Sequence, residues 1–165
     1  MNRLLILPVL LLTLLVGNAA FSADFQKGLT AAQSGDYATA LRQFQPLAEL
    51  GNVRAQTMLA SMYEEGKGVP QNNKTAVKWF RLAAKQGHAK SQYNLGVMYQ
   101  KGQGVPQDYK TAVKWYRLAA KQGHALSQGK LSVIYALGKG VIKDLVYAHM
   151  WGNIAATNGN KLGAK

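Results

Sequence analysis

The sequence predicts an all-α fold in which antiparallel helix hairpins stack into a repeat array. The first observation is a near-copy: residues 74–89 and 110–125 are identical except for Phe80 and Tyr116. The second is that the same offset of 36 residues relates glycines, alanines and aromatic residues over most of the chain. The glycines in this register are Gly51, Gly87, Gly123 and Gly159. Such a period is typical of helical repeats, which stack because no single unit can bury its apolar face.

The first residues have the pattern of a secretory signal peptide. Arg3 lies in a short polar head before an apolar run over residues 4–16. This run is shorter than the about 20 residues that a membrane-spanning helix needs. Small residues near its end suit cleavage after Ser22 or Ala23. We therefore expect residues 1–22 to be removed and the mature chain to be periplasmic or secreted, with no transmembrane segment; a retained N-terminal anchor is the alternative.

The composition limits the partners of the chain. There is no cysteine, so neither a disulfide nor a cysteine-linked lipid is available, and stability must come from packing. Twenty Lys and Arg residues face seven Asp and Glu residues, which gives a net charge of +13. That charge favours anionic partners such as acidic proteins, anionic lipids or polyanionic glycans. We do not expect nucleic acid as the partner of an exported protein.

The segment after the leader predicts a shorter hairpin than the later units. Residues 23–53 lack the glycine-rich turn found further along the chain. Gly28 also stands only 12 residues before Ala40, whereas Gly96 stands 16 residues before Ala112. We interpret this segment as an N-terminal capping hairpin.

Each later unit predicts two helices joined by an eight-residue turn, which in the middle unit is KGQGVPQD at 101–108. The apolar face of the first helix contains Ser91, Leu95, Met98 and Tyr99, and that of the second contains Ala112, Trp115, Tyr116, Ala119 and Ala120. We expect Gly102 to end the first helix in the left-handed conformation, Pro106 to prevent its continuation and Asp108 to cap the second helix. The predicted hairpins are 25–50, 54–86, 90–122 and 126–158.

The last unit departs from this pattern. Ile142 stands where the earlier turns have proline, and the tail after Gly159 is too short and glycine-rich for a further helix. We expect the apolar end of the array to be poorly covered, so that self-association or a docked partner competes with ordinary intramolecular packing. The residues concerned are Leu145, Tyr147, Trp151 and Ile154.

The repeat unit resembles the Sel-one-like repeat family, which is related to the tetratricopeptide repeats. The residues that carry the resemblance are Ser91, Leu95, Gly96, Tyr99, Gly102, Gly104, Val105, Ala112, Trp115, Tyr116, Ala119, Ala120 and Gly123. Three such repeats cover residues 54–162, at about 54–89, 90–125 and 126–162, and the hairpin before them resembles a plain tetratricopeptide hairpin. The resemblance implies a right-handed α-solenoid used for protein–protein interaction.

No constellation of residues predicts catalysis, a metal site or a cofactor. His88 and His124 begin equivalent helices and are separated by about two helix spacings of 8–10 Å, too far to share a metal, so a capping or packing role is expected. The adjacent Glu64 and Glu65 diverge around the helix and face no second acidic cluster. Some cysteine-rich members of the resembling family bind or hydrolyse β-lactams, but this chain has none of their cysteines. We therefore do not expect an enzyme, and a β-lactam enzyme is the least favoured alternative.

A basic stripe lies on one face of the second helices, at helical spacing. It contains Lys74, Lys78, Arg81, Lys85, Lys110, Lys114, Arg117 and Lys121. The first hairpin has Ala38, Arg42, Gln45 and Glu49 at the same positions. The stripe is either a solvated face or a surface for an anionic glycan or lipid of the cell envelope.

The face of the first helices opposite their apolar stripe is the candidate partner-binding face. It contains Arg54, Thr57, Ser61, Glu64, Lys90, Tyr93, Val97 and Gln100, and continues in the third repeat as Leu126, Gly129, Val133 and Ala136. In the resembling family this face lines a concave groove, which here suits an extended peptide or a helix. Trp79, Trp115 and Trp151 recur at the repeat period and are expected to pack between repeats. The leading prediction is an exported scaffold that binds a protein partner through this face.

Overall fold

The structure, a computed structural model, describes residues 22–163, and all the regular secondary structure in that range is helical. A helix over residues 22–33 comes first. It is followed by α2 (Tyr37–Glu49), α3 (Val53–Glu65), α4 (Asn73–Lys85), α5 (Ala89–Lys101), α6 (Tyr109–Lys121), α7 (Ala125–Leu137) and α8 (Leu145–Gly163). The predicted signal sequence, apart from Ser22, lies outside the described residues. None of the helices described combines the length and hydropathy needed to cross a membrane.

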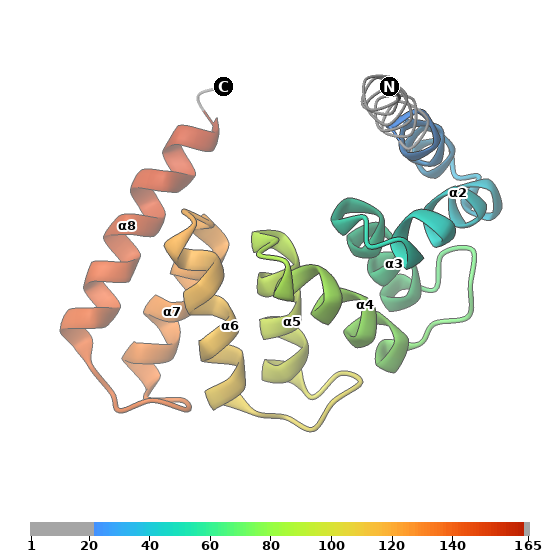
Figure 1. The fold of residues 1–165 in the computed structure, drawn as a ribbon. Coiled ribbons are helices and arrows are strands. Elements are labelled where there is room, and N and C mark those ends of the chain that lie inside the picture. Colours follow the sequence, from blue (N-terminus) through green and yellow to red (C-terminus); the bar gives the residue numbers. More distant parts are fainter. Residues whose placement is uncertain (1–21, 164–165) are drawn as a thin grey trace, which may run out of the picture.

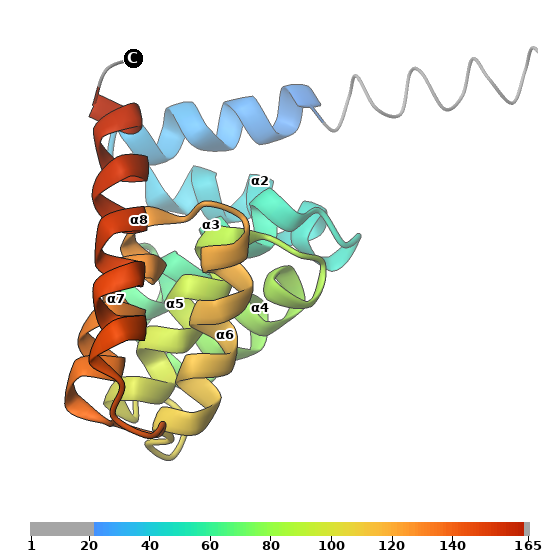
Figure 2. The ribbon, with the colours of Figure 1, turned by 90° about the vertical axis from the view of Figure 1, so that its left-hand side faces the viewer.

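The helices form four hairpins that stack side by side into a curved array (Figure 1). From α2 to α8, each helix packs against the next one along the chain, within a hairpin and between hairpins. The helix over residues 22–33 and α3 lie on the inner side of the curve, with α2 and α4 outside them (Figure 1). Seen from the side, α8 runs along one end of the array (Figure 2). The predicted all-α solenoid is confirmed.

The turns follow from the residues that the sequence places in them. Gly102 has a φ of +70°, a conformation that glycine adopts without strain, and it ends α5 as predicted. Asp108 begins α6, because its carboxylate accepts a hydrogen bond from the Thr111 backbone N–H at 3.1 Å. In the N-terminal hairpin the turn is shorter, and Asp36 caps α2 through the Thr39 N–H.

Alanines, tryptophans and buried amide side chains hold the units together. Alanines on the second helices are fully buried and let neighbouring helices approach closely; they include Ala76, Ala83, Ala84, Ala112, Ala119 and Ala120. Trp79 packs against two successive core clusters, so the predicted packing role of this tryptophan between repeats is confirmed. A ladder of amides adds to the stack: Gln92 donates to the Ala84 carbonyl at 3.1 Å and accepts from Gln122 at 2.8 Å. Gln56 with Gln86, and Gln128 with Asn158, repeat the pair.

The last helix differs from the prediction. The sequence predicts that the final hairpin ends at residue 158, but α8 continues through Gly159 to Gly163. Gly51, Gly87 and Gly123 adopt a positive φ where the chain reverses into the next first helix. No such reversal occurs after α8 within the described residues, so the helix extends instead. Of the four residues predicted to be poorly covered at this end, Leu145, Tyr147 and Ile154 are exposed, whereas Trp151 packs against the core cluster of the last repeat.

Candidate functional site

The predicted partner-binding residues lie on the first helices α3 and α5, and most of them reach the surface. Arg54 and Lys90 are exposed, one at the start of each helix. Five others are partly exposed further along the same helices: Ser61, Glu64, Tyr93, Val97 and Gln100. Thr57 is different, because only 5% of its surface is accessible. The structure therefore places seven of the eight residues on a face that a partner can reach, and we call this face of α3 and α5 the inner face.

Thr57 belongs to a hydrogen-bond network between two successive units. Its Oγ1 lies 2.8 Å from Ser91 Oγ and 3.1 Å from His88 Nδ1, and these two atoms lie 2.9 Å apart. His124 begins the next first helix and makes the equivalent bond to Ser127 at 2.9 Å. His124 caps its helix by accepting from the Ser127 backbone N–H, whereas the His88 side chain makes no capping bond and packs between Thr57 and Ser91, so each histidine has one of the two predicted roles. Thr57 is buried in the contact between units and does not reach the surface. The sequence pattern did not predict this network, because the network depends on how α5 packs beside α3.

Tyr93 is the centre of an aromatic group that links the inner face to the core. Its ring lies 5.0 Å from the His124 ring and 5.9 Å from that of Tyr116, both in tilted geometry. The buried Tyr116 extends from α6 beneath Gly96, and its hydroxyl donates to Gln100 Oε1 at 2.7 Å. Tyr93 and Gln100 are therefore held in place from below, which preorganises this part of the face.

The charges of this face are shaped by burial and by neighbours. Burial lowers the pKa of His88 below its ordinary value, and the cations Lys90 and Arg54 add to this effect. Burial raises the pKa of the Glu64 carboxyl, the Glu65 carboxylate adds to the rise, and Lys101 opposes it. The face is thus basic at the starts of α3 and α5 and acidic at the end of α3.

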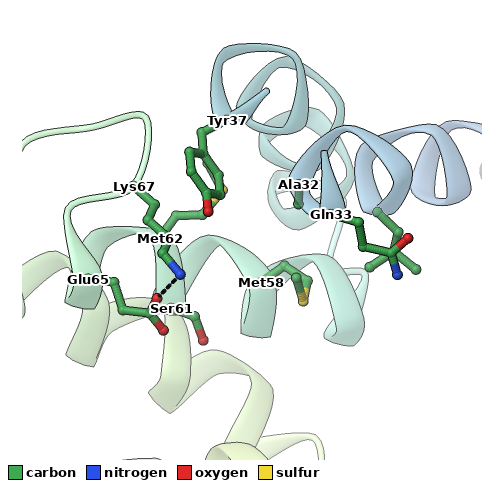
Figure 3. Close-up of a pocket in the computed structure, with 9 residues that line it drawn as sticks. Ala32, Gln33, Tyr37, Met58, Ser61, Met62, Glu65 and Lys67 are labelled. Atoms are coloured by element: carbon green, nitrogen blue, oxygen red, sulfur yellow. Dashed lines mark ion pairs between the residues drawn. The ribbon is translucent and has the colours of Figure 1, made fainter. Parts of the chain in front are cut away.

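A cavity of about 300 Å³ continues the inner face into the N-terminal hairpin (Figure 3). It lies between helix 22–33 and α3, with Leu29, Ala32, Gln33, Tyr37, Met58, Ser61, Met62, Glu65 and Lys67 around it. The Lys67 ammonium forms an ion pair with Glu65 at 2.6 Å and lies 5.6 Å from the centre of the Tyr37 ring. These three side chains lie together in the lining of the cavity. Flexible methionines in such a position adapt to the shape of an apolar side chain. The sequence did not predict this cavity, because it forms between two different hairpins.

The basic stripe lies on the second helices, away from this face. All six of its lysines are exposed, on α4 and α6. Its two arginines bond to tyrosines of the following unit: Arg81 donates to the Tyr99 hydroxyl at 2.9 Å, and Arg117 donates to that of Tyr135. Among the side chains that the structure describes, the one ion pair is that of Lys67 with Glu65, so no stripe lysine is in an ion pair there. Asp108 is a carboxylate near the stripe; its hydrogen bonds with Thr111 lower its pKa, and Lys114 adds to this effect.

The described residues contain no group of three or more His, Cys, Asp or Glu side chains that could hold a metal ion. The face also lacks a nucleophile paired with a base, because Ser91 and Ser127 are buried beside the histidines at the start of their helices. What the arrangement offers is a preorganised surface of mixed polarity with an apolar cavity at one end.

Comparisons with known proteins agree with this geometry. The model of the Sel1 repeat matches three successive segments, 53–88, 89–124 and 125–160. No curated protein sequence matches the chain. Among solved structures, a Sel1 repeat protein from Oxalobacter formigenes is 34% identical with a TM-score of 0.77, over 82% of this chain and 54% of its own. A protective antigen of uropathogenic Escherichia coli strains, with an SLR fold, is 38% identical with a TM-score of 0.82, over 84% of this chain and 31% of its own.

This chain thus spans about half and about a third of the length of those two structures. Cysteine-rich protein B of Helicobacter pylori has a TM-score of 0.60 over 75% of this chain and 89% of its own; at 21% identity the likeness shows the fold alone. Proteins with Sel1 repeats generally act as scaffolds for protein interaction and not as enzymes. Three matched repeats and two neighbours above 30% identity show that this chain belongs to the Sel1 repeat family.

Proposed function

We propose that this chain is an exported, non-catalytic scaffold that binds an extended segment of another protein along its inner face. The observation that carries the proposal is the continuity of that face. The Thr57–Ser91 hydrogen bond joins α3 to α5, both helices carry exposed or partly exposed residues of this face, and Ser61 on α3 also lines the methionine-lined cavity beside helix 22–33. An extended segment matches such a surface, because its backbone can bond to the polar side chains while one apolar side chain fills the cavity.

The face has the polarity that peptide recognition requires. Lys90 and Gln100 offer a cation and an amide at the two ends of α5, with Tyr93 and Val97 partly exposed between them. Tyr93 is already fixed by its neighbours, so binding costs little side-chain entropy at this position. Export is supported by the charged head and apolar run at the start of the sequence.

The test is affinity capture from a cell-envelope extract, followed by titration of the purified captured protein. Two variants of equal charge change provide the comparison: Lys90→Glu on the inner face and Lys114→Glu on the outer stripe, both exposed. Ser61→Trp is a third variant, which fills the mouth of the cavity. We expect Lys90→Glu and Ser61→Trp to weaken binding at least about tenfold and Lys114→Glu to leave it unchanged. A partner that is lost only with Lys114→Glu would overturn the inner-face proposal.

A second candidate function is binding of an anionic component of the envelope through the basic stripe. The observation in its favour is that the six stripe lysines are exposed, and that no carboxylate among the described residues pairs with them. Such binding would weaken steeply with salt, because exposed charges are screened beyond about 8–10 Å at physiological ionic strength. Lys114→Glu would reduce it and Lys90→Glu would not, so the same two variants separate the two candidates.

A further inference from the structure

The third repeat breaks the basic stripe in a specific way. In the repeat register, Val146 and Met150 of α8 stand where α6 has Lys110 and Lys114. Val146 is 79% exposed and Met150 40% exposed, so both side chains face solvent as the lysines do. The outer face is therefore cationic over two repeats, whereas in the third it is apolar at the start of α8 and polar but uncharged further along, at Asn153 and Thr157. Stacking does not require this change, because solvent-facing positions on α4 and α6 carry lysine without loss of packing.

The turn before α8 extends the apolar part to the edge of the array. Ile142 occupies the place of Pro106 in the preceding turn and is 90% exposed, the most exposed large apolar residue among those described. Its neighbour Val141 packs against the core cluster of the last repeat, which fixes the turn and leaves Ile142 outside. The φ values of Gly138 and Gly140, +69° and +72°, match those of the preceding turn, so the backbone is unchanged and only the side chain is new.

Cations surround these apolar side chains. Lys139 and Lys143 flank Ile142 in the turn, and both are exposed. Figures 1 and 2 both place the α5–α6 and α7–α8 turns at the same edge of the array, where α6 begins at Tyr109 with Lys110 next to it. The one carboxylate in this turn, Asp144, accepts the Tyr147 backbone N–H at 2.9 Å and so caps α8. The edge is thus an apolar tip with a positive border.

A cavity of about 460 Å³ opens beside this tip, between Arg117, Tyr135, Val141, Ile142, Asp144 and Tyr147. The Tyr147 ring lies 5.2 Å from that of Tyr135, and the Arg117 guanidinium lies 5.7 Å from the Tyr135 ring centre. Arginine binds phosphate with a planar set of donors. Tyrosine is favoured where apolar chains meet polar headgroups.

We propose that this edge is a docking surface for an anionic lipid bilayer. Ile142, Leu145 and Val146 enter the boundary between headgroups and acyl chains, while Lys110, Lys114, Lys139 and Lys143 contact lipid phosphates. An exposed apolar tip with a border of cations favours a bilayer over a soluble polyanion, because a soluble polyanion has no apolar region in which the tip could be buried. The inference names the lipid bilayer as the anionic partner of the second candidate function, and it is independent of the protein-binding proposal.

The test is a co-sedimentation assay with the chain that begins at residue 23, which retains every buried residue described. Two kinds of vesicle are compared: phosphatidylcholine alone, and phosphatidylcholine mixed with phosphatidylglycerol. We expect binding only to the anionic vesicles.

Ile142→Pro restores the residue found in the earlier turns. The Ile142 N–H donates no backbone hydrogen bond in the turn, so we expect the fold to be kept. The substitution should weaken binding about tenfold, the loss expected for one inserted apolar side chain. Lys110→Glu with Lys114→Glu should weaken it at least about 25-fold, since each cation at an anionic surface contributes about fivefold. The matched control, Lys27→Glu with Lys90→Glu, changes the charge equally elsewhere and should retain more binding.

Insertion has a direct readout, because the chain has no cysteine. A polarity-sensitive fluorophore on Ile142→Cys should shift to the blue on anionic vesicles, while the same probe on Leu50→Cys, also exposed, should not. Salt-sensitive binding that ignores Ile142→Pro and shows no probe shift would overturn the insertion. No binding to either vesicle would overturn the whole inference, as would a concentration-dependent dimer lost with Ile142→Pro, which would assign the edge to a second copy. None of these outcomes bears on capture of a protein by the inner face.

Discussion

Replacing Gly96 by alanine tests how tightly the two helices of the middle repeat are packed. Gly96 is buried in α5 directly against the Tyr116 ring of α6. A Cβ atom at this position would lie 2.7 Å from Tyr116 Cε1 and 2.8 Å from Cδ1, distances that real Cβ atoms do not adopt. The ring would have to move, and its hydroxyl would then lose its bond to Gln100.

Three effects decide the magnitude. Alanine favours the helix over glycine by about 1 kcal/mol. Overpacking a well-filled core costs about 2 kcal/mol. Loss of the Tyr116–Gln100 hydrogen bond costs about 1 kcal/mol. We therefore expect Gly96→Ala to lower the free energy of unfolding by about 2 kcal/mol, measured by urea denaturation followed by circular dichroism.

Gly129→Ala is the matched control. It makes the same change inside α7, but a Cβ there would meet no atom within 4 Å. It should stabilise the protein by up to about 1 kcal/mol through helix propensity alone. If Gly96→Ala were as stabilising as this control, the close contact with the Tyr116 ring would be refuted.

A double-mutant cycle sharpens the test. The first repeat has Ala60 and Phe80 at the positions of Gly96 and Tyr116, both fully buried in one core cluster. Tyr116→Phe removes the hydroxyl that holds the ring toward Gln100 and should cost about 1 kcal/mol alone. Combined with Gly96→Ala it recreates the native pair of the first repeat. The loss in free energy of unfolding of the double variant should therefore be about 1 kcal/mol smaller than the sum of the losses of the two single variants. Strict additivity would contradict this interpretation.

Two further predictions concern the turns and the histidines. Gly104→Ala should destabilise the protein by about 3 kcal/mol in the same denaturation assay, because a Cβ would overlap the Asn73 carbonyl at a φ of +72°; Gly87→Ala, with a positive φ but open space, should cost only about 1 kcal/mol. Burial and nearby cations lower the pKa of His88 and His124 below 6.5 in the folded protein. The unfolded chain then binds protons more readily, so this contribution to stability is full above the unfolded pKa of about 6.5 and falls as the pH drops below it. His88→Asn with His124→Asn should flatten this slope, and an unchanged slope would show that other groups cause it.

The array could be predicted from the repeat period, because the ends of each helix are determined by nearby turn and cap residues that recur with that period. Each internal turn has a glycine that ends one helix and an Asn or Asp that caps the next, with a proline between them in the first two turns. As a result α3 with α4 spans 53–85, one residue from the predicted 54–86. The packing role of Trp79 also followed, since a large aromatic residue at each repeat needs a neighbour to cover it.

What the sequence could not predict depends on contacts between different units. Thr57 has helical spacing for the inner face, but His88 and Ser91, at the start of α5, cover it. The N-terminal cavity exists because helix 22–33 meets α3 across a boundary between two kinds of hairpin. α8 extends past Gly159 because a glycine ends a helix only where the chain also reverses.

The internal copies themselves separate the requirements of the fold from those of a binding surface. A position that must be filled for stacking keeps its character in every repeat: Ala76, Ala112 and Ala148 are all buried. A solvent position has no such constraint, and a change there from Lys110 to Val146 replaces a hydrated cation with exposed apolar surface, which water disfavours. That change brings no gain in the core. Insertion of the outer edge into lipid, as proposed above, would bury this apolar surface, whereas a purely structural role for the third repeat leaves it in water.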